Sequence, residues 1–226
     1  MKFIISFLIL FSVSLYAQSN IKVIYEFTDY GGYRGELELF VKDNLSSFIF
    51  HKDPATLTNE KGWEFYHYFE HYENYYDRFS NEITETRLMN DKEKTLVISL
   101  WQLDLKWKIT NETKEINGYT AQKAICESYN ISGRGDWNYG DAIAWFTTDI
   151  PIGVGPERYY GLPGLIVFLE FSLRSSRSYL LKKVVYDERI DSIEIPKKGI
   201  QVSKAEIVNP GTIDKQWLKK RKKELE

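Results

Sequence analysis

The segment from Pro151 to Gly164 constrains the fold more than any other, because it is dense in glycine and proline and so cannot form a helix. Leu162 precedes a proline and is therefore expected in an extended conformation. Pro163 fixes its own φ at the second position of a tight turn. Gly164 follows at the third position, where a type II turn requires φ > 0. The pattern predicts a turn at 161–164 that serves the fold and offers no reactive side chain.

The stretches on either side of this segment are typical of β-strands. Leu165–Leu169 is an apolar run short enough for a strand with both faces covered. Ala142–Ile150 alternates well enough to be predicted as the preceding strand. The sequence therefore predicts two strands joined by an irregular loop.

These residues also carry a resemblance to a known family. The sequence GLPGLI at 161–166 follows AWFTTDIPIGVGPERYY, and further matching segments lie upstream at 107–110, 112–119 and 122–124. In these features the chain resembles the GLPGLI family, Porph_ging-type secreted proteins found mainly in Bacteroidetes. The resemblance implies an exported protein, but it carries over no established activity. It marks six residues as a structural signature: Gly161, Leu162, Pro163, Gly164, Leu165 and Ile166.

The N-terminal residues 1–17 have the organisation of a secretory signal peptide. One lysine precedes an uncharged apolar core, and the small residue Ala17 stands at a plausible cleavage point before Gln18. We therefore expect an exported protein that is periplasmic or associated with the outer membrane. The expected organisation is a signal peptide at 1–17, one β-rich domain at 18–212 with an aromatic-rich insertion at 52–90, and a basic tail at 213–226.

The remaining pattern predicts a mainly β (α+β) protein built on a curved antiparallel sheet or open half-barrel. Short strand-like runs recur with little helix between them. The sequence shows no βαβ alternation, which is the pattern that would indicate a parallel sheet. In architecture this resembles the half-barrels of periplasmic lipoprotein carriers. Further strands are predicted at Ile21–Thr28, Gly35–Val41, Ser47–His51, Thr95–Leu105, Trp107–Thr110, Tyr119–Ile131, Tyr179–Asp187 and Asp191–Ile195, with a polar turn at Asn111–Gly118.

The aromatic residues from Trp63 to Phe79 fit two periodicities. A period of 3.6 places many of them on one side of a helix, whereas a period of 2 suits a strand; length favours a helical or irregular insertion. On a helix, Glu64, His67 and His71 would share a face that could hold a divalent ion such as zinc. No fourth ligand or metalloprotease motif accompanies them. We expect an aromatic packing face, with a metal-handling accessory protein as the alternative.

Aromatic side chains make up 15% of the chain, and several of them lie close to the signature. On a curved antiparallel sheet such side chains can line a concave groove for an apolar ligand. They can equally fill a core that has few helices to cover the sheet, and both interpretations stay open. The candidate binding residues are Trp137, Trp145, Arg158, Tyr159, Tyr160, Leu162 and Pro163.

No motif for catalysis or for a cofactor is present. The sequence lacks a phosphate-binding glycine loop, a nucleophile elbow and a metalloprotease helix. Cys126 is the single cysteine, and in a predicted strand it is expected to be a buried apolar residue. A formal net charge of −2 does not indicate nucleic-acid binding, and no later apolar stretch is long enough to span a membrane. We expect a protein without a cofactor that is not an enzyme, a binding or chaperone-like module for an apolar ligand or an envelope protein.

The tail combines Trp217 and Leu218 with a run of five basic residues at 219–223. A short helix with a thin apolar stripe is predicted there. The basic run is either a solvated helix end or a contact for an anionic surface.

Overall fold

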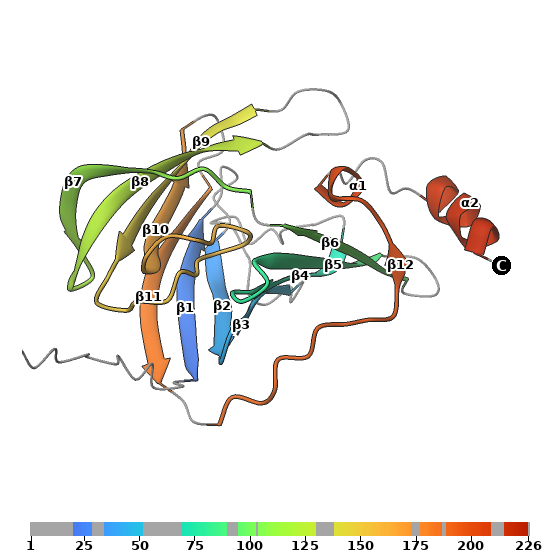
Figure 1. Ribbon diagram of the computed structural model, residues 1–226, viewed down its shortest axis with the longest axis horizontal. Helices are drawn as coiled ribbons and strands as arrows, with labels where there is room; N and C mark the ends of the chain where they lie inside the picture. Colours follow the sequence, from blue (N-terminus) through green and yellow to red (C-terminus); the bar gives the residue numbers. More distant parts are fainter. Residues whose placement is uncertain are drawn as a thin grey trace, which may run out of the picture.

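The protein is built on one curved sheet of 12 strands (Figure 1). The computed structural model describes residues 20–28, 34–51, 69–89, 95–102, 104–129, 138–172, 177–186, 189–208 and 215–225. The strand order is β12-β6-β5-β4-β3-β2-β1-β11-β10-β9-β8-β7, so the edge strands β12 and β7 do not pair with each other. Among the described strands the short β12–β6 pair is the parallel one. The predicted mainly β, curved antiparallel architecture is confirmed.

Most of the predicted strands are present, with small shifts at their ends. The described strands are β1 (Ile21–Thr28), β2 (Arg34–Lys42), β3 (Leu45–His51), β4 (Phe69–Asp77), β5 (Glu82–Met89), β6 (Leu96–Gln102), β7 (Lys108–Ile116), β8 (Tyr119–Tyr129), β9 (Asn138–Thr147), β10 (Leu165–Phe171), β11 (Ser178–Tyr186) and β12 (Ile200–Gln201). Two helices follow, α1 (Lys204–Val208) and α2 (Lys215–Leu225).

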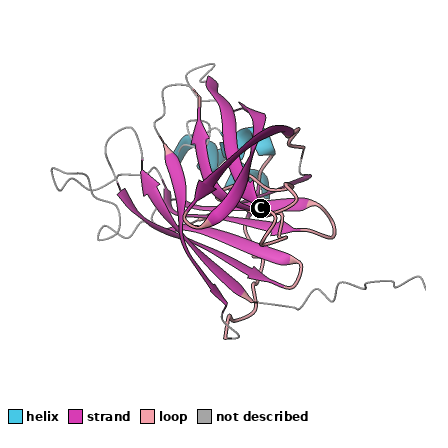
Figure 2. Cartoon of the chain, turned by 90° about the vertical axis from the view of Figure 1, so that its left-hand side faces the viewer, coloured by secondary structure: helices cyan, strands magenta, loops and turns pink. Residues whose placement is uncertain are grey.

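Strand β1 lies at the centre of the sheet, between β2 and β11. Ile21, Val23, Tyr25 and Phe27 are buried, while the residues between them are more exposed. Successive side chains of a strand point to opposite faces, so this alternation defines an inner, buried face and an outer face. Figure 2, turned by 90°, shows how the sheet curves around that inner face.

The polar turn predicted at Asn111–Gly118 is wrong over residues 111–116, because β7 continues through Ile116. Asn117 and Gly118 alone form the turn, with φ of 48° and 81°, and Ile116 pairs directly with Tyr119. A two-residue hairpin loop with positive φ at both positions is the conformation that Asn-Gly favours. The residues before it tolerate charge because β7 is an edge strand whose side chains are mostly exposed.

The helix favoured for the aromatic-rich insertion is wrong over Phe69–Asp77, which forms β4 and pairs with β3 and β5. Tyr75 and Tyr76 are consecutive and so point to opposite faces, yet each is only 5% exposed. Because both faces of β4 are covered, aromatic residues occur at neighbouring positions and the alternation of a strand is hidden. Glu64 and His67 lie outside the described residues.

The strand predicted at Asp191–Ile195 is also wrong. Residues 189–198, here called the strap, form no strand of the sheet and run from the end of β11 to β12 as the long orange segment of Figure 1. Ile193 and Ile195 are half-buried, whereas Glu194 between them is exposed. Packing of alternate residues against the sheet produces the same sequence pattern as a strand, without strand pairing.

Two apolar clusters stabilise the fold. The larger joins the inner faces of the sheet to the loop between β9 and β10, and it contains the fully buried rings of Tyr25, Phe48 and Tyr160. Complete burial of one large apolar side chain contributes about 1.5–3 kcal/mol relative to exposure. The smaller cluster lies where β6, β12, α1 and α2 meet: Val97, Ile200, Val202, Ile207 and Leu218, with Trp217 packed against it.

The inner face of the β4–β6 region also carries a buried polar row. Glu85 and Arg87 form an ion pair at 2.8 Å, with side chains 0% and 6% exposed. The strand register places Asn74 and Ser99 on either side of Glu85. Removing one partner of such a buried pair is strongly destabilising, because the other charge is left in a low-dielectric interior. We therefore assign this row to the fold.

The C-terminal helix predicted within residues 213–226 is confirmed as α2, whereas α1 was not predicted. Helix α1 begins with a capping box in which Glu206 Oε2 accepts from the Ser203 N–H at 2.8 Å and Ser203 Oγ accepts from the Glu206 N–H at 3.3 Å. The Ser203 N–H holds the pKa of Glu206 below its ordinary value against the effect of burial, with help from Arg221 and a hydrogen bond from the Trp217 side chain. These contacts connect α1 to α2.

Across the described ranges, the structure contains no helix both long and apolar enough to cross a membrane. The predicted signal peptide at 1–17 lies outside those ranges.

Candidate functional site

The loop between β9 and β10, residues 148–164, holds most of the signature and is here called the signature loop. It folds back on itself. Gly153 O accepts from the Gly161 N–H at 2.9 Å, and Val154 O accepts from the Ile166 N–H at 3.0 Å. The outgoing and returning parts of the loop therefore lie side by side, as in an irregular hairpin. This arrangement orders a segment that its glycines and prolines exclude from regular structure.

The type II turn predicted at the signature is wrong in its detail. Gly161 has a φ of 88°, but Gly164 does not lie in the positive-φ region. Glycine is required at 164 for a different reason, because a Cβ there would lie closer than 3.0 Å to the backbone oxygen of Thr147. Real Cβ atoms essentially never approach so closely. The role of Gly164 is thus a close approach between two backbones.

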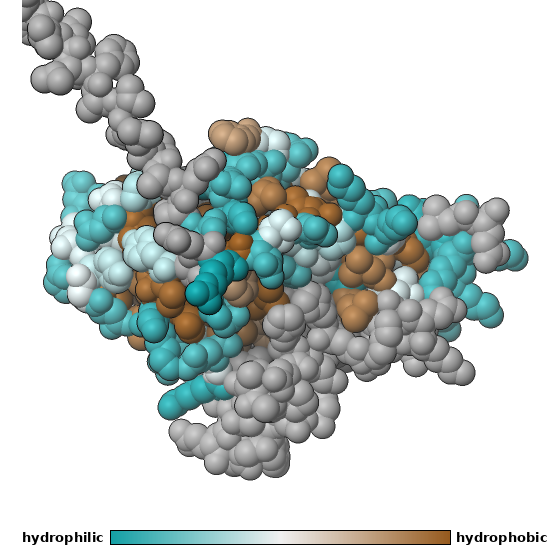
Figure 3. Space-filling model, turned by 90° about the horizontal axis from the view of Figure 1, so that it is seen from below, coloured by the Kyte–Doolittle hydropathy of each residue, from teal (hydrophilic) through white to brown (hydrophobic). Residues whose placement is uncertain are grey.

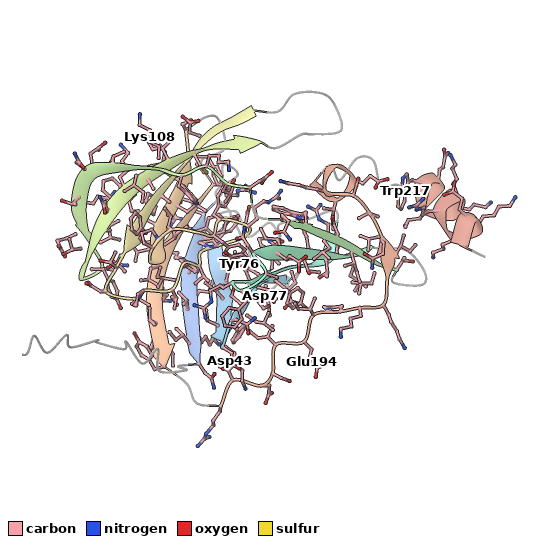
Figure 4. The ribbon with its side chains drawn as sticks, in the orientation of Figure 1. Asp43, Tyr76, Asp77, Lys108, Glu194 and Trp217 are labelled. Atoms are coloured by element: carbon pink, nitrogen blue, oxygen red, sulfur yellow. The ribbon has the colours of Figure 1, made fainter. Side chains whose placement is uncertain are left out.

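Four of the candidate groove residues belong to the core, and three of them lie in the loop between β9 and β10. Tyr159, Tyr160 and Leu162 are 3%, 0% and 3% exposed and form part of the larger apolar cluster. The ring of Tyr160 stacks on Tyr76 at 4.5 Å between centroids, and its carbonyl accepts from Trp107 Nε1 at 2.8 Å. Figure 4 shows Tyr76 near the middle of the molecule. At these positions the chain's own loop fills the hollow of the sheet, which favours the core-filling interpretation.

The other candidate residues are in different settings. Trp145 on β9 is the fourth core member at 8% exposure, and Lys114 Nζ lies 4.0 Å from its ring centroid. Arg158 is half-buried and Pro163 is exposed. Trp137 lies outside the described residues. A lysine covers the ring of Trp145, so this side chain does not line an open apolar groove.

Glu157 is a buried carboxylate within the same loop, with a φ of 53° and 6% exposure. It accepts a hydrogen bond from the Tyr179 hydroxyl and pairs with Arg177 at 3.2 Å. Arg177 in turn lies over the ring of Phe171 at 4.8 Å. The carboxylate therefore ties the loop to β11. The sequence signal was an acidic residue directly after Pro156 in a loop rich in glycine and proline.

A pocket of about 420 Å³ lies on the opposite, outer face of the sheet, under the start of the strap. We call it the outer pocket. Apolar and charged side chains are mixed on both of its walls. The sheet supplies Lys22, Phe40, Ser47, Ile49, Glu73 and Tyr75, and the strap supplies Arg189, Ile190, Asp191, Ser192, Ile193 and Glu194.

The polar part of the outer pocket centres on Glu73, whose carboxylate accepts from the Ser47 hydroxyl. Burial raises the pKa of Tyr75 well above its ordinary value, and the charge of Glu73 and a hydrogen bond to it add to this effect. Tyr75 therefore stays protonated near neutral pH. A phenol whose pKa lies far above the ambient pH acts as a hydrogen-bonding group and is a poor acid–base catalyst.

The remaining walls are fixed by contacts within the sheet and by one between the sheet and the strap. Lys22 pairs with Glu38, and its Nζ lies 5.4 Å from the centroid of the Phe40 ring. Lys42 Nζ donates to the carbonyl of Ile190 at 2.9 Å and so holds the first part of the strap against the sheet. Glu194 lies on the strap below the strands in Figure 4. No residue of this pocket is a candidate from the sequence, because its walls come from five separate segments.

The thiol of Cys126 is buried at 3% exposure, as predicted. Burial, together with the charge of Asp141, raises its pKa to about 12. The reactive form of cysteine is the thiolate, so this thiol is a weak nucleophile at neutral pH.

The structure does not assemble the proposed metal ligands in the part of the chain that it describes. His71 lies in β4, where its backbone is paired with that of His51. A helical face shared with Glu64 and His67 is therefore not formed at His71. No group of three or more His, Cys, Asp or Glu side chains suited to a metal ion occurs among the described residues.

Residues 137–168 match the model of a family described as "Protein of unknown function (Porph_ging)". The match spans β9, the signature loop and the first part of β10, so it covers a short stretch of the chain. The comparison with curated proteins finds no match.

Two crystal forms of PNGF-II share the fold. Each has a TM-score of 0.57, with 16% and 17% sequence identity over 82% and 86% of this chain. The alignment covers 31% and 32% of those chains, so this protein spans about a third of the length of PNGF-II. An uncharacterized conserved protein from Thermus thermophilus aligns with 8% identity and a TM-score of 0.43, over 83% of this chain and 92% of that one.

Proposed function

We propose that the protein is an exported, non-catalytic binding module of the cell envelope, and that it holds a peptide segment of a partner protein in the outer pocket. The observation that carries the proposal is the pocket of about 420 Å³ between the sheet and the strap. Ligand sites commonly enclose about 300–1,000 Å³ and combine apolar walls with a few polar groups. Phe40, Ile49 and Ile193 offer the apolar walls, and Glu73 and its hydrogen-bonded neighbours offer the polar groups.

The chemistry of the walls indicates which partner segment fits. Glu73, Asp191 and Glu194 bring three carboxylates to the pocket, against two cations, Arg189 and Lys22, of which Lys22 is paired with Glu38. Carboxylates accept hydrogen bonds, so the pocket suits a segment with an apolar body and donor groups at its end. The loop between β9 and β10 fills the hollow of the sheet with its own side chains. This favours the outer pocket as the ligand site and disfavours a concave apolar groove.

Native mass spectrometry of the full chain, purified from the envelope fraction of its own cells, tests the proposal. We expect a co-purifying peptide or protein on the wild type. Ile49→Trp, which fills the outer pocket, should remove it. Ile109→Trp is the matched control, because Ile109 is 46% exposed on the edge strand β7. A partner that is retained by Ile49→Trp would contradict the proposed site.

Export is tested separately by N-terminal sequencing of the same preparation. The signal at 1–17 leads us to expect a chain that begins at Gln18. Retention of Met1 on protein from the envelope fraction would contradict cleavage.

A further inference from the structure

The charges of the chain are divided unevenly along its length. Residues 197–226 contain 9 basic and 4 acidic side chains, which leaves 21 basic and 28 acidic side chains elsewhere among the 30 and 32 of the whole chain. A net charge of −2 therefore hides a basic C-terminal part and an acidic remainder. Such separation gives a protein a field that orients it toward surfaces of one sign.

Within this basic part, helix α2 packs against the end of the sheet. Leu218 is 3% exposed in the smaller apolar cluster, and the half-buried Trp217 packs against the same cluster. Helix α2 therefore uses its apolar side to dock on β6, β12 and α1. Lys197 and Lys198 directly precede Gly199 and β12, and Ile200 of β12 contributes to the same cluster. The strap lysines and α2 consequently lie at one end of the molecule.

Docking through Leu218 directs three lysines outward. At about 100° per residue, Lys219, Lys223 and Lys220 lie about 100°, 140° and 200° around the helix from Leu218. All three are exposed, in agreement with this geometry. Arg221 on the other side is half-buried and pairs with Glu224. We call Lys219, Lys220 and Lys223 the lysine face; none of its members forms an ion pair with another described residue.

We infer that the lysine face binds the anionic surface of a lipid bilayer and orients the protein on it. Charge complementarity carries the choice of partner, because three exposed lysines on one side of a helix suit a negatively charged layer. Leu218 is buried against the protein and Trp217 packs against the same cluster, so we expect an electrostatic contact that inserts neither side chain. The hydrophilic colouring at the right-hand end of Figure 3 agrees with this. The site is separate from the outer pocket and does not depend on its ligand.

Co-sedimentation of the full chain with vesicles tests the inference. We expect binding to vesicles that contain phosphatidylglycerol, none to vesicles of phosphatidylcholine alone, and loss of binding as salt rises beyond about 0.15 M. The variant Lys219→Gln, Lys220→Gln, Lys223→Gln should bind on the order of 100-fold more weakly, at about fivefold per lysine.

The matched control neutralises three exposed lysines elsewhere, Lys106, Lys108 and Lys183. Figure 4 shows Lys108 at the end of the molecule opposite Trp217. Circular dichroism should show that both variants fold. Equal losses in both triple variants, or salt-independent binding, would overturn the inference. Retention of the wild type on immobilised polyglutamate without vesicle binding would also overturn it, and would assign the face to an acidic protein.

Discussion

The backbone of Gly164 passes directly against the backbone of Thr147, so closely that no side chain fits between them. Thr147 ends β9 and Gly164 immediately precedes β10, and Leu165 is paired with Thr147 in the sheet. The contact therefore closes the signature loop at its base. Glycine serves here as a spacer of minimal width and not as a residue with an unusual φ.

Gly164→Ala should destabilise the protein by about 3 kcal/mol or more, because the backbone would have to shift to admit the added Cβ. Overpacking commonly costs about 1–3 kcal/mol and sometimes more. Gly164→Val should cost more still. Gly118→Ala is the control, because Gly118 has a φ of 81° with no atom within 4 Å of an added Cβ, and it should lose about 1–2 kcal/mol. Pro163→Ala, at an exposed position, should lose less than about 1 kcal/mol. Urea denaturation measures all four. Equal losses at 164 and 118 would contradict the spacer role.

Tyr25→Phe should destabilise the fold by about 1–3 kcal/mol, because it leaves a buried carbonyl without its donor. The Tyr25 hydroxyl donates to Ile166 O at 2.7 Å and so links β1 to β10. Tyr186→Phe, at a tyrosine that is 64% exposed, should leave the melting temperature unchanged. Thermal denaturation of both variants gives the comparison, and similar small shifts in both would show that the Tyr25 bond contributes little.

Cys126 should not react with a thiol reagent in the native protein at pH 8. Burial, aided by the Asp141 charge, raises its pKa to about 12, so the thiolate population at pH 8 is very small. In denaturant the one cysteine should react fully, at the rate of an ordinary thiol. Absorbance after addition of Ellman's reagent follows both states. Rapid reaction of the native chain would show that solvent reaches this part of β8.

Acid should remove a small stabilising contribution from Asp77. Burial alone would raise its pKa, but hydrogen bonds from Asn44 and from the N–H groups of Phe79 and Ser80 outweigh burial and lower it. A lowered folded-state pKa contributes stability that is complete above the unfolded value of about 3.9 and is lost as pH falls through the folded value. The difference in stability between wild type and Asp77→Asn should therefore shrink below about pH 4, from less than about 1 kcal/mol at pH 7.

Asn44→Ala provides the control for this titration. Asn44 Nδ2 donates to Asp77 Oδ1 at 2.6 Å, so its removal should move the pKa of Asp77 upward. Carbon-detected NMR of the Asp77 carboxyl reads the pKa directly. An unchanged value in Asn44→Ala would show that the turn N–H groups alone hold the carboxylate ionised.

Local patterns in the sequence predicted much of the sheet. The strand predicted at Ile21–Thr28 matches β1 over its full length, and the polar turn predicted at Asn111–Gly118 contains the hairpin turn at Asn117-Gly118, although residues 111–116 belong to β7. The signature was predicted to be an irregular segment with structural glycines. These features depend on residues that are close in the chain, because backbone preferences and side-chain alternation act locally.

Contacts between distant segments were decided only by the tertiary structure. Strand β4 has covered faces on both sides, so its alternation was hidden, and the strap showed alternation without pairing. The outer pocket joins Lys22 to Glu194 across most of the chain. Gly164 was recognised as necessary, but its reason, the neighbouring Thr147 backbone, depends on how β9 and β10 pair. A sequence states which conformations each residue permits, whereas close approaches and pockets arise from which strands become neighbours.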